Sequence, residues 1–121
     1  MCHVLIIEDE PIVAMDLEVL LASAGATSFD VACSQDDAVA SALKHSPEFI
    51  TSDVRLTQGT GPLAVTEIHA ALGPIPVIYI TGTPGACYPR GADALVFTKP
   101  FNRAVIIKAF RECRSRSQIT A

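Results

Sequence analysis

Five short segments that favour β-strands recur along this chain of 121 residues, and stretches with helical periodicity separate them. Strands that alternate with helices predict an α/β fold, in which a parallel sheet carries helices on both faces. The second segment alternates apolar and polar residues, which favours a position at the edge of the sheet. The expected strands are His3–Ile7, Ser28–Cys33, Phe49–Ser52, Val77–Ile80 and Ala94–Phe97.

Capping and helix-breaking residues mark the helices between these strands. Pro11 suits the first turn of one helix, which Gly25 ends. Ser34, with Asp37 three residues later, resembles a capping box for a second helix that runs to about Lys44. From their helical spacing, the side chains expected to face the core are Val13, Leu17, Leu20, Ala24, Val39, Ala42, Leu43, Val65, Ile68, Leu72, Ile106, Ala109, Phe110 and Cys113.

Residues 81–93 depart from the alternation. A helix is expected there, but two prolines and three glycines make a regular helix costly. We therefore expect a short turn or an irregular loop in place of the fourth helix. The last helix resumes the pattern, and Asn102 is placed to cap it.

Composition indicates one folded domain. Half of the residues are apolar and 18% are charged, which is typical of a compact domain rather than a disordered chain. The length suits a single domain over residues 1–121, with no effector domain. Its apolar runs are too short to cross a bilayer, and its start lacks a secretory signal. We expect a cytoplasmic protein without membrane contact.

The charges are unevenly spread along the chain. Residues 1–60 carry ten acids and two bases, whereas residues 61–121 carry three acids and seven bases. A nucleic-acid-binding domain would present a basic face, but these bases concentrate in the last helix. Nucleic-acid binding is therefore not expected, and a solvated helix face is favoured over a docking surface for an acidic partner.

The cysteines and histidines show no motif in the sequence. No two of the four cysteines form a CxxC pair, which favours reduced structural thiols. The three histidines, at positions 3, 45 and 69, share no metal-ligand spacing with each other or with the cysteines. Each histidine is expected to be a surface or half-buried residue.

Polar residues follow four of the expected strands at the ends that parallel strands share. The first strand leads to Glu8 and Asp9, and the third leads to Asp53. The fourth leads to Thr81, and the fifth to Lys99. Ligands of open α/β sheets collect at this edge. Carboxylates gathered there favour a hard divalent cation, and Mg²⁺ fits because it prefers oxygen ligands and phosphate.

This set of residues suits phosphoryl transfer. Asp53 is the expected nucleophile, because a carboxylate can form an acyl phosphate. The reaction asks the protein mainly for positioning and charge neutralisation. Lys99 and Mg²⁺ would supply positive charge, and the Thr81 hydroxyl would donate a hydrogen bond to a phosphoryl oxygen.

The sequence resembles, over essentially its whole length, a receiver domain of bacterial two-component response regulators. The motifs that carry the resemblance are Val4–Pro11, Ser52–Leu56, Tyr79–Gly82 and Phe97–Phe101. The resemblance implies a flavodoxin-like three-layer sandwich whose five-stranded parallel sheet has the order 2-1-3-4-5. It also implies that Asp53 accepts a phosphoryl group from a sensor histidine kinase or a histidine phosphotransferase.

The resemblance further implies the ligands of the Mg²⁺ ion. Glu8 and Asp9 match the acidic pair of the family, with Asp9 the direct ligand. Asp53 and the backbone carbonyl of Arg55 match the other protein ligands.

Near the end of the last strand the chain both matches the family and departs from it. Thr81 and Lys99 match the residues that hold the phosphoryl group, and the Lys99–Pro100 peptide is expected to be cis. Most receivers carry an aromatic residue three positions before the lysine, but Val96 stands there. Phe97 follows one step later and should face the other side of the sheet.

Three functions follow from these residues. The first is a single-domain response regulator that binds an unknown downstream protein or acts as a phosphate sink for a kinase. It is not expected to be an enzyme acting on a foreign substrate. The loop after Thr81 also resembles stand-alone and stress-response receivers of alphaproteobacterial type. The second is a pseudo-receiver that binds a partner without phosphorylation. The third, an aspartyl-phosphate phosphohydrolase, is disfavoured because Arg55 occupies the position of its acid/base aspartate.

Overall fold

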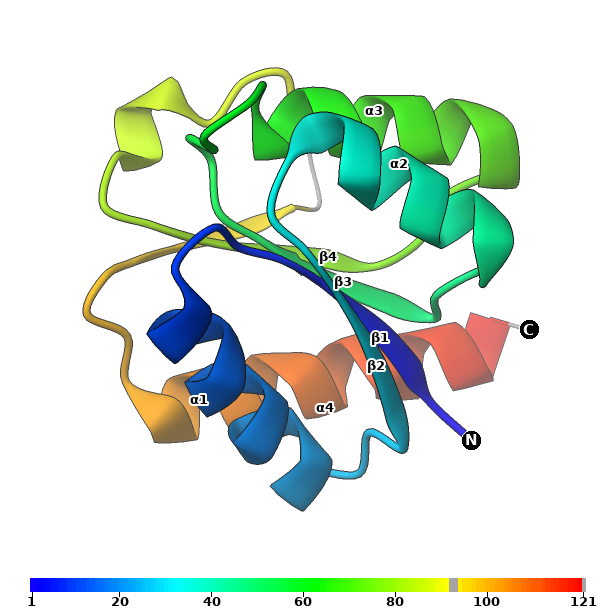
Figure 1. The fold of residues 1–121 in the computed structure, drawn as a ribbon. Coiled ribbons are helices and arrows are strands. Elements are labelled where there is room, and N and C mark those ends of the chain that lie inside the picture. Colours follow the sequence, from blue (N-terminus) through cyan, green and yellow to red (C-terminus); the bar gives the residue numbers. More distant parts are fainter. Residues whose placement is uncertain (92–93, 121) are drawn as a thin grey trace.

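We describe the protein from a computed structural model, which defines residues 1–91 and 94–120. Figure 1 shows the chain as alternating strands and helices. The strands are β1 (His3–Ile7), β2 (Ser28–Ala32), β3 (Phe49–Ser52), β4 (Val77–Thr81) and β5 (Leu95–Thr98). The helices are α1 (Pro11–Ser23), α2 (Gln35–Lys44), α3 (Gly61–Leu72) and α4 (Arg103–Thr120), with a 3₁₀ turn, η1, at Pro84–Ala86.

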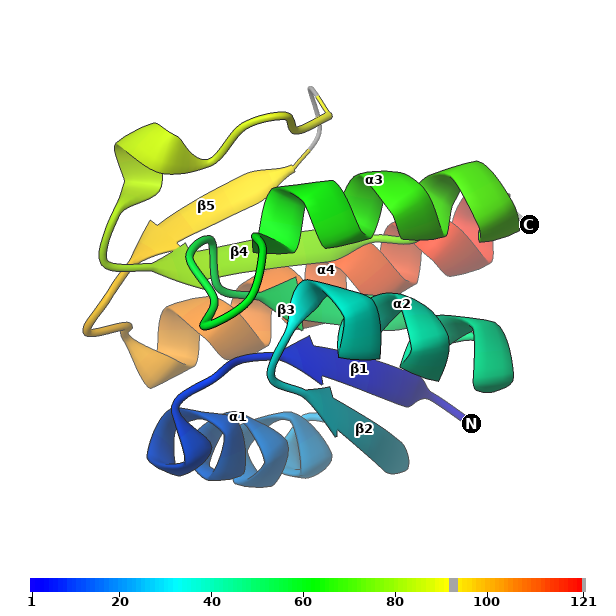
Figure 2. The same cartoon turned by 45° about the horizontal axis from the view of Figure 1, so that its top comes forward.

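The five strands form one sheet in the order β2-β1-β3-β4-β5, and every neighbouring pair is parallel. Helices α1 and α4 cover one face of the sheet, and α2 and α3 cover the other (Figures 1 and 2). The expected three-layer, flavodoxin-like α/β fold is confirmed, including β2 at an edge. Because all strands run the same way, their C-terminal ends lie together at one end of the sheet.

A separate apolar core fills each side of the sheet. Val4 and Ile6 of β1 point into the core beneath α1 and α4, where Phe49 and Phe110 meet edge to face at 4.9 Å. Leu5, the residue between them, points into the core beneath α2 and α3. This alternation is the two-residue period of a strand, and burial on both faces explains why β1 is apolar from Val4 to Ile7.

The expected helix caps are present. Ser34 Oγ accepts the Asp37 N–H at 3.1 Å, and Asn102 Oδ1 accepts the Val105 N–H at 3.3 Å. The expectation that Leu43 and Leu72 face the core is wrong, because these residues are 55% and 37% exposed. Helix α2 instead buries Ala38 and Ala42, so it packs on the sheet through small residues.

The segment between β4 and β5 is irregular, as expected. Within its described part, the single 3₁₀ turn η1 stands in place of a helix; residues 92–93 lie outside the described ranges. The Lys99–Pro100 peptide is cis, as expected, and the Tyr88–Pro89 peptide is also cis. None of the helices in the described ranges combines the length and apolar character that a bilayer crossing requires.

Candidate functional site

Asp53 stands at the C-terminal end of β3, in the middle of the sheet. Its backbone N–H donates to the Ile7 carbonyl of β1 at 2.8 Å, which continues the pairing of the two strands. One carboxylate oxygen, Oδ1, accepts the Val54 N–H at 2.7 Å. The residue is only 8% exposed. The carboxylate is therefore fixed at the sheet edge with a small opening to solvent.

Lys99 crosses from the end of β5 to the same place. Its Nζ lies 2.9 Å from Asp53 Oδ2, 3.1 Å from Glu8 Oε1 and 3.7 Å from Glu10 Oε2. The first two contacts are between groups that are largely buried, so they are screened little by solvent. The structure thus brings Lys99, Glu8 and Asp53 together, while Glu10 is a partner that the sequence analysis did not name.

Burial and charge shift the pKa of two of these groups. Burial raises the pKa of Glu8 to about 7, and the nearby Asp53 carboxylate adds to the rise, while the hydrogen bond from Lys99 opposes it. Burial lowers the pKa of Lys99, but its hydrogen bonds to Asp53 and Glu8 outweigh that effect and raise it. Lys99 therefore carries its positive charge at neutral pH, and Glu8 titrates near neutrality.

Asp9 completes an acidic group with Glu8 and Asp53. One carboxylate oxygen from each residue lies within 4.8 Å of the others. Asp9 Oδ2 accepts the Thr57 hydroxyl at 3.1 Å, which orients the carboxylate from the loop after β3. Three hard oxygen donors at this separation fit Mg²⁺. Arg55 lies two residues beyond Asp53, and its backbone carbonyl as a further ligand stays a prediction.

Thr81 is buried at the end of β4, but its hydroxyl is engaged elsewhere. Thr81 Oγ1 accepts the Thr83 N–H at 3.0 Å and lies 3.2 Å from Thr83 Oγ1. Thr81 is thus brought to the expected strand end while its hydroxyl bonds to its own loop rather than to Asp53. The roles of Thr83 and Thr57 were missed, and the signal for both was a hydroxyl residue shortly after a strand end.

A pair of glutamines ties the loop after β3 to the start of α2. Gln35 Oε1 accepts the Thr60 N–H at 3.0 Å, and Gln58 Oε1 accepts the Asp36 N–H at 3.2 Å. The Gln35 N–H also donates to the Gln58 carbonyl at 2.9 Å. These bonds fix the loop that carries Thr57, and so help to place Asp9.

Val96 and Phe97 lie on opposite sides of β5. Val96 packs against the core beneath α2 and α3, whereas Phe97 packs against the core beneath α1 and α4. Phe97 therefore does not occupy the side on which the family carries its aromatic residue, as expected.

Residues 4–111 match the response regulator receiver domain. The chain belongs to this family. The receiver is also 36% identical over 105 residues to the phyllosphere-induced regulator PhyR of Methylorubrum extorquens. That match covers 84% of this chain but only 39% of the relative, so the chain spans about two-fifths of the curated protein's length.

Two solved structures extend the likeness. A variant of the anti-anti-sigma factor PhyR from Bartonella quintana is 30% identical, with a TM-score of 0.82 over 97% of this receiver and 50% of that chain. The receiver domain of a sensor histidine kinase from Pseudomonas aeruginosa is 27% identical, with a TM-score of 0.79 over 92% of this chain and 95% of that one. That structure holds a magnesium ion in its active-site cleft.

Proposed function

We propose that this receiver accepts a phosphoryl group on Asp53 from a sensor histidine kinase or a histidine phosphotransferase. The observation that carries the proposal is the Lys99 ammonium, 2.9 Å from Asp53 Oδ2 and beside the acidic group of Glu8, Asp9 and Asp53. An Asp53 oxygen attacks the phosphorus of a phosphohistidine, so the new P–O bond forms as the P–N bond breaks. The electron pair of the broken bond leaves with the imidazole.

The residues around Asp53 have complementary roles in this transfer. Glu8, Asp9, Asp53 and the backbone carbonyl of Arg55 would hold Mg²⁺, and the ion would supply positive charge near the phosphoryl oxygens. Lys99 gives up part of its contact with Asp53 and balances the new phosphoryl charge. The Thr81 hydroxyl, released from Thr83, donates to a phosphoryl oxygen. Bound Mg²⁺ in the related Pseudomonas aeruginosa receiver supports this use of the acidic group.

The phosphorylated receiver then acts through another protein, in the cytoplasm and without contact to nucleic acid. It either binds an unidentified downstream partner or drains phosphate from a kinase, and it turns over no foreign substrate. The likeness to proteins named PhyR, one of them described as an anti-anti-sigma factor, makes an anti-sigma factor one candidate partner class.

Phosphorylation of Asp53 is tested with Mg²⁺ and acetyl phosphate, and by profiling against the histidine kinases encoded in the same genome. Mass spectrometry of the intact chain should show one added phosphoryl group in the wild type. Asp53→Asn should show none, whereas Asp36→Asn, which alters an exposed acid of α2, should behave as the wild type. A wild-type chain that no donor modifies would reject the proposal.

A pseudo-receiver that binds its partner without phosphorylation is the second candidate. Val96 in place of the usual aromatic residue and the single turn η1 in place of a helix favour it, because both lie where receivers change shape. Under this alternative, the wild type and Asp53→Asn bind the partner with equal affinity, and a phosphodonor changes neither. A difference between the two proteins that appears only with the donor supports phosphorylation.

A further inference from the structure

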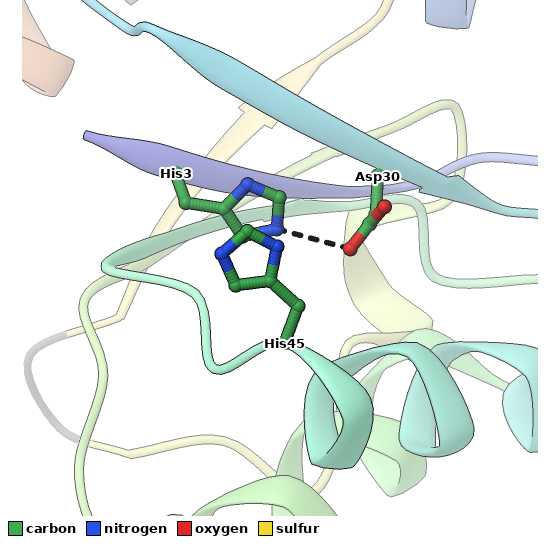
Figure 3. A group of neighbouring side chains, drawn as sticks. All are labelled: His3, Asp30 and His45. Atoms are coloured by element: carbon green, nitrogen blue, oxygen red, sulfur yellow. Dashed lines mark hydrogen bonds and ion pairs between the residues drawn. The ribbon is translucent and has the colours of Figure 1, made fainter. Parts of the chain in front are cut away.

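A second cluster of titratable side chains lies apart from the Asp53 site. His3 begins β1, Asp30 lies on the neighbouring strand β2, and His45 follows the last residue of α2 (Figure 3). Asp53 follows the opposite, C-terminal end of its strand. The expectation that each histidine is at the surface or half-buried is wrong for His3, which is 5% exposed.

Both ring nitrogens of His3 have polar partners, which fix the orientation of the ring. Its Nε2 lies 3.0 Å from Asp30 Oδ2, and its Nδ1 lies 2.8 Å from Ser28 Oγ. The His45 ring lies on the face of the His3 ring, with 3.6 Å between the ring centroids and 12° between the planes. Figure 3 shows both rings beside the Asp30 carboxylate. One ring is thus buried and fixed, while the other comes from the exposed end of a helix.

We propose that His3, Asp30 and His45 form a binding site for a zinc-type transition-metal ion. One ligand atom from each residue lies within 4.8 Å of the other two. Two imidazoles and one carboxylate are donors that Zn²⁺ and Co²⁺ accept readily, whereas Mg²⁺ prefers oxygen donors alone. The site therefore selects a different class of ion from the acidic group around Asp53.

The distances require only a modest rearrangement. Ligands about 2.0–2.1 Å from a tetrahedral ion lie roughly 3.3–3.4 Å from each other. His3 Nε2 and Asp30 Oδ2, at 3.0 Å, therefore need to separate by only a few tenths of an ångström. His45 moves more, since parallel stacked rings cannot aim their in-plane lone pairs at one ion. Its ring is exposed, and among the described residues no hydrogen bond holds it, so it is able to swing off the stack.

The Ser28 hydroxyl makes the required histidine tautomer available. When His3 Nε2 donates to Asp30, Nδ1 accepts from the Ser28 hydroxyl. When Nε2 binds an ion, Nε2 gives up its proton and Nδ1 takes one up from solvent, so the ring stays neutral and Nδ1–H donates to the same Ser28 oxygen. A ligating histidine with its other nitrogen bonded in this way is held in orientation by its partner. The change of tautomer thus keeps the bond to Ser28.

The proposed metal site is open to solvent and lies between α2 and the strands β1 and β2. The Asp30 side chain is 39% exposed and His45 is at the surface, so an ion enters from solvent and keeps a water ligand. A bound ion would join the end of α2 to β1 and β2, in addition to the ring stack and the bond from the Glu48 N–H to the His3 carbonyl at 2.8 Å. It would stabilise the folded chain by an amount that grows with the logarithm of the free ion concentration once that concentration exceeds the dissociation constant.

The test uses the full chain without a polyhistidine tag, in saturating Mg²⁺. Zn²⁺ binding is measured by calorimetry, and Co²⁺ binding by visible absorption. The wild type should bind one ion per chain, and Co²⁺ should give the bands of a tetrahedral site without a thiolate band. His45→Ala and Asp30→Asn, which alter exposed or half-exposed residues, should weaken binding at least tenfold. The matched controls His69→Ala and Asp36→Asn should bind as the wild type does.

Three results would overturn the site. The first is equal Zn²⁺ affinity in the wild type, His45→Ala and Asp30→Asn. The second is a thiolate band in the Co²⁺ spectrum. The third is loss of Zn²⁺ binding in Asp53→Asn but not in Asp30→Asn. Phosphorylation of Asp53 is measured on the same proteins and should be unchanged in His45→Ala. Failure of the metal site is therefore distinguishable from failure of the proposed signalling function.

Discussion

Gly61 lies so close to Asp53 that a Cβ atom at position 61 would stand 1.8 Å from the Asp53 carbonyl oxygen and 2.1 Å from Ser52 Oγ. The Gly61 N–H donates to the Val54 carbonyl at 2.9 Å, so the first turn of α3 is packed directly on the backbone of the site. A side chain at this position would push the backbone that carries Asp53.

Gly61→Ala should therefore destabilise the protein. Adding a methyl group where backbone must shift costs about 1–3 kcal/mol. Urea unfolding should show that loss, and phosphorylation by acetyl phosphate should slow. The control Gly85→Ala, where an added Cβ meets nothing within 4 Å, should stay within about 0.5 kcal/mol of the wild type. Equal stability of the two variants would contradict the close contact.

Lys99→Met should destabilise the chain in the absence of metal. The substitution leaves the Glu8 and Asp53 carboxylates buried without their shared cation, and removing one partner of a buried ion pair costs about 2 kcal/mol or more. Urea unfolding at pH 8 in chelator measures the loss. Lys108→Met, on the exposed surface of α4, is the control and should change little. A Lys99→Met protein as stable as the control would argue against the ion pair.

The raised pKa of Glu8 predicts a pH dependence of metal-free stability. Between the usual value of 4.5 and about 7, the folded state holds more protons on Glu8 than the unfolded state does. This contribution to stability therefore falls as pH rises through that window, by on the order of 3 kcal/mol at most. The Lys99 contribution is present below its unfolded pKa of 10.5 and is lost only at higher pH.

Glu8→Gln should remove the Glu8 part of this slope. The measurement is the free energy of unfolding in chelator at pH 5, 6, 7 and 8, with Glu18→Gln on the surface of α1 as the control. The difference in free energy of unfolding between the wild type and Glu8→Gln should change with pH. The difference between the wild type and Glu18→Gln should stay the same. If the free energy of unfolding depends on pH in the same way in all three proteins, the pKa of Glu8 is not raised.

Asp9→Asn should weaken Mg²⁺ binding at least tenfold if the acidic group holds the ion as proposed. The neutral amide removes one of three charged oxygen donors that lie within 4.8 Å of each other. Thr57→Ala should have a smaller effect in the same direction, because Thr57 only orients Asp9. Calorimetry measures both, and Asp36→Asn serves as the control. Unchanged affinity in Asp9→Asn would place the ion elsewhere.

The Thr81–Thr83 contact predicts a signal of activation. The Thr81 hydroxyl has to turn toward Asp53 to donate to a phosphoryl group, and this movement changes the hydrogen bond that it accepts from the Thr83 N–H. With Mg²⁺ and beryllofluoride as a phosphate mimic, the Thr83 amide resonance should shift in the wild type. Asp53→Asn, which lacks the acceptor carboxylate, should show no such shift. An unmoved Thr83 resonance in the wild type would show that Thr81 keeps its loop contact.

Much of the fold could be predicted because its signals are local. Strand β1 begins and ends at the expected residues, and the cap of α2 at Ser34 follows from two residues three apart. The irregular segment after β4 follows from its prolines and glycines. The strand order itself came from resemblance, because periodicity does not say which strands are neighbours.

The remainder depends on contacts between distant parts of the chain. Lys99 and Asp53 could be expected to meet because both follow parallel strands, but the approach of Gly61 to the Asp53 carbonyl is a packing detail without a sequence signature. The pairing of His3 with His45 was missed for a similar reason. Spacing rules find ligands on one element, whereas this pair joins the start of a strand to the end of a helix.

The pairing of β4 with β5 continues by one backbone hydrogen bond beyond the two strands. The Lys99 N–H donates to the Thr81 carbonyl at 2.9 Å, directly after the paired residues Thr81 and Thr98 of β4 and β5. The main chain thus joins Thr81 and Lys99, the two residues whose side chains are proposed to bind the phosphoryl group. If the end of β4 moves, the end of β5 should therefore move with it. A spectroscopic probe placed near either strand end would then report the movement of both.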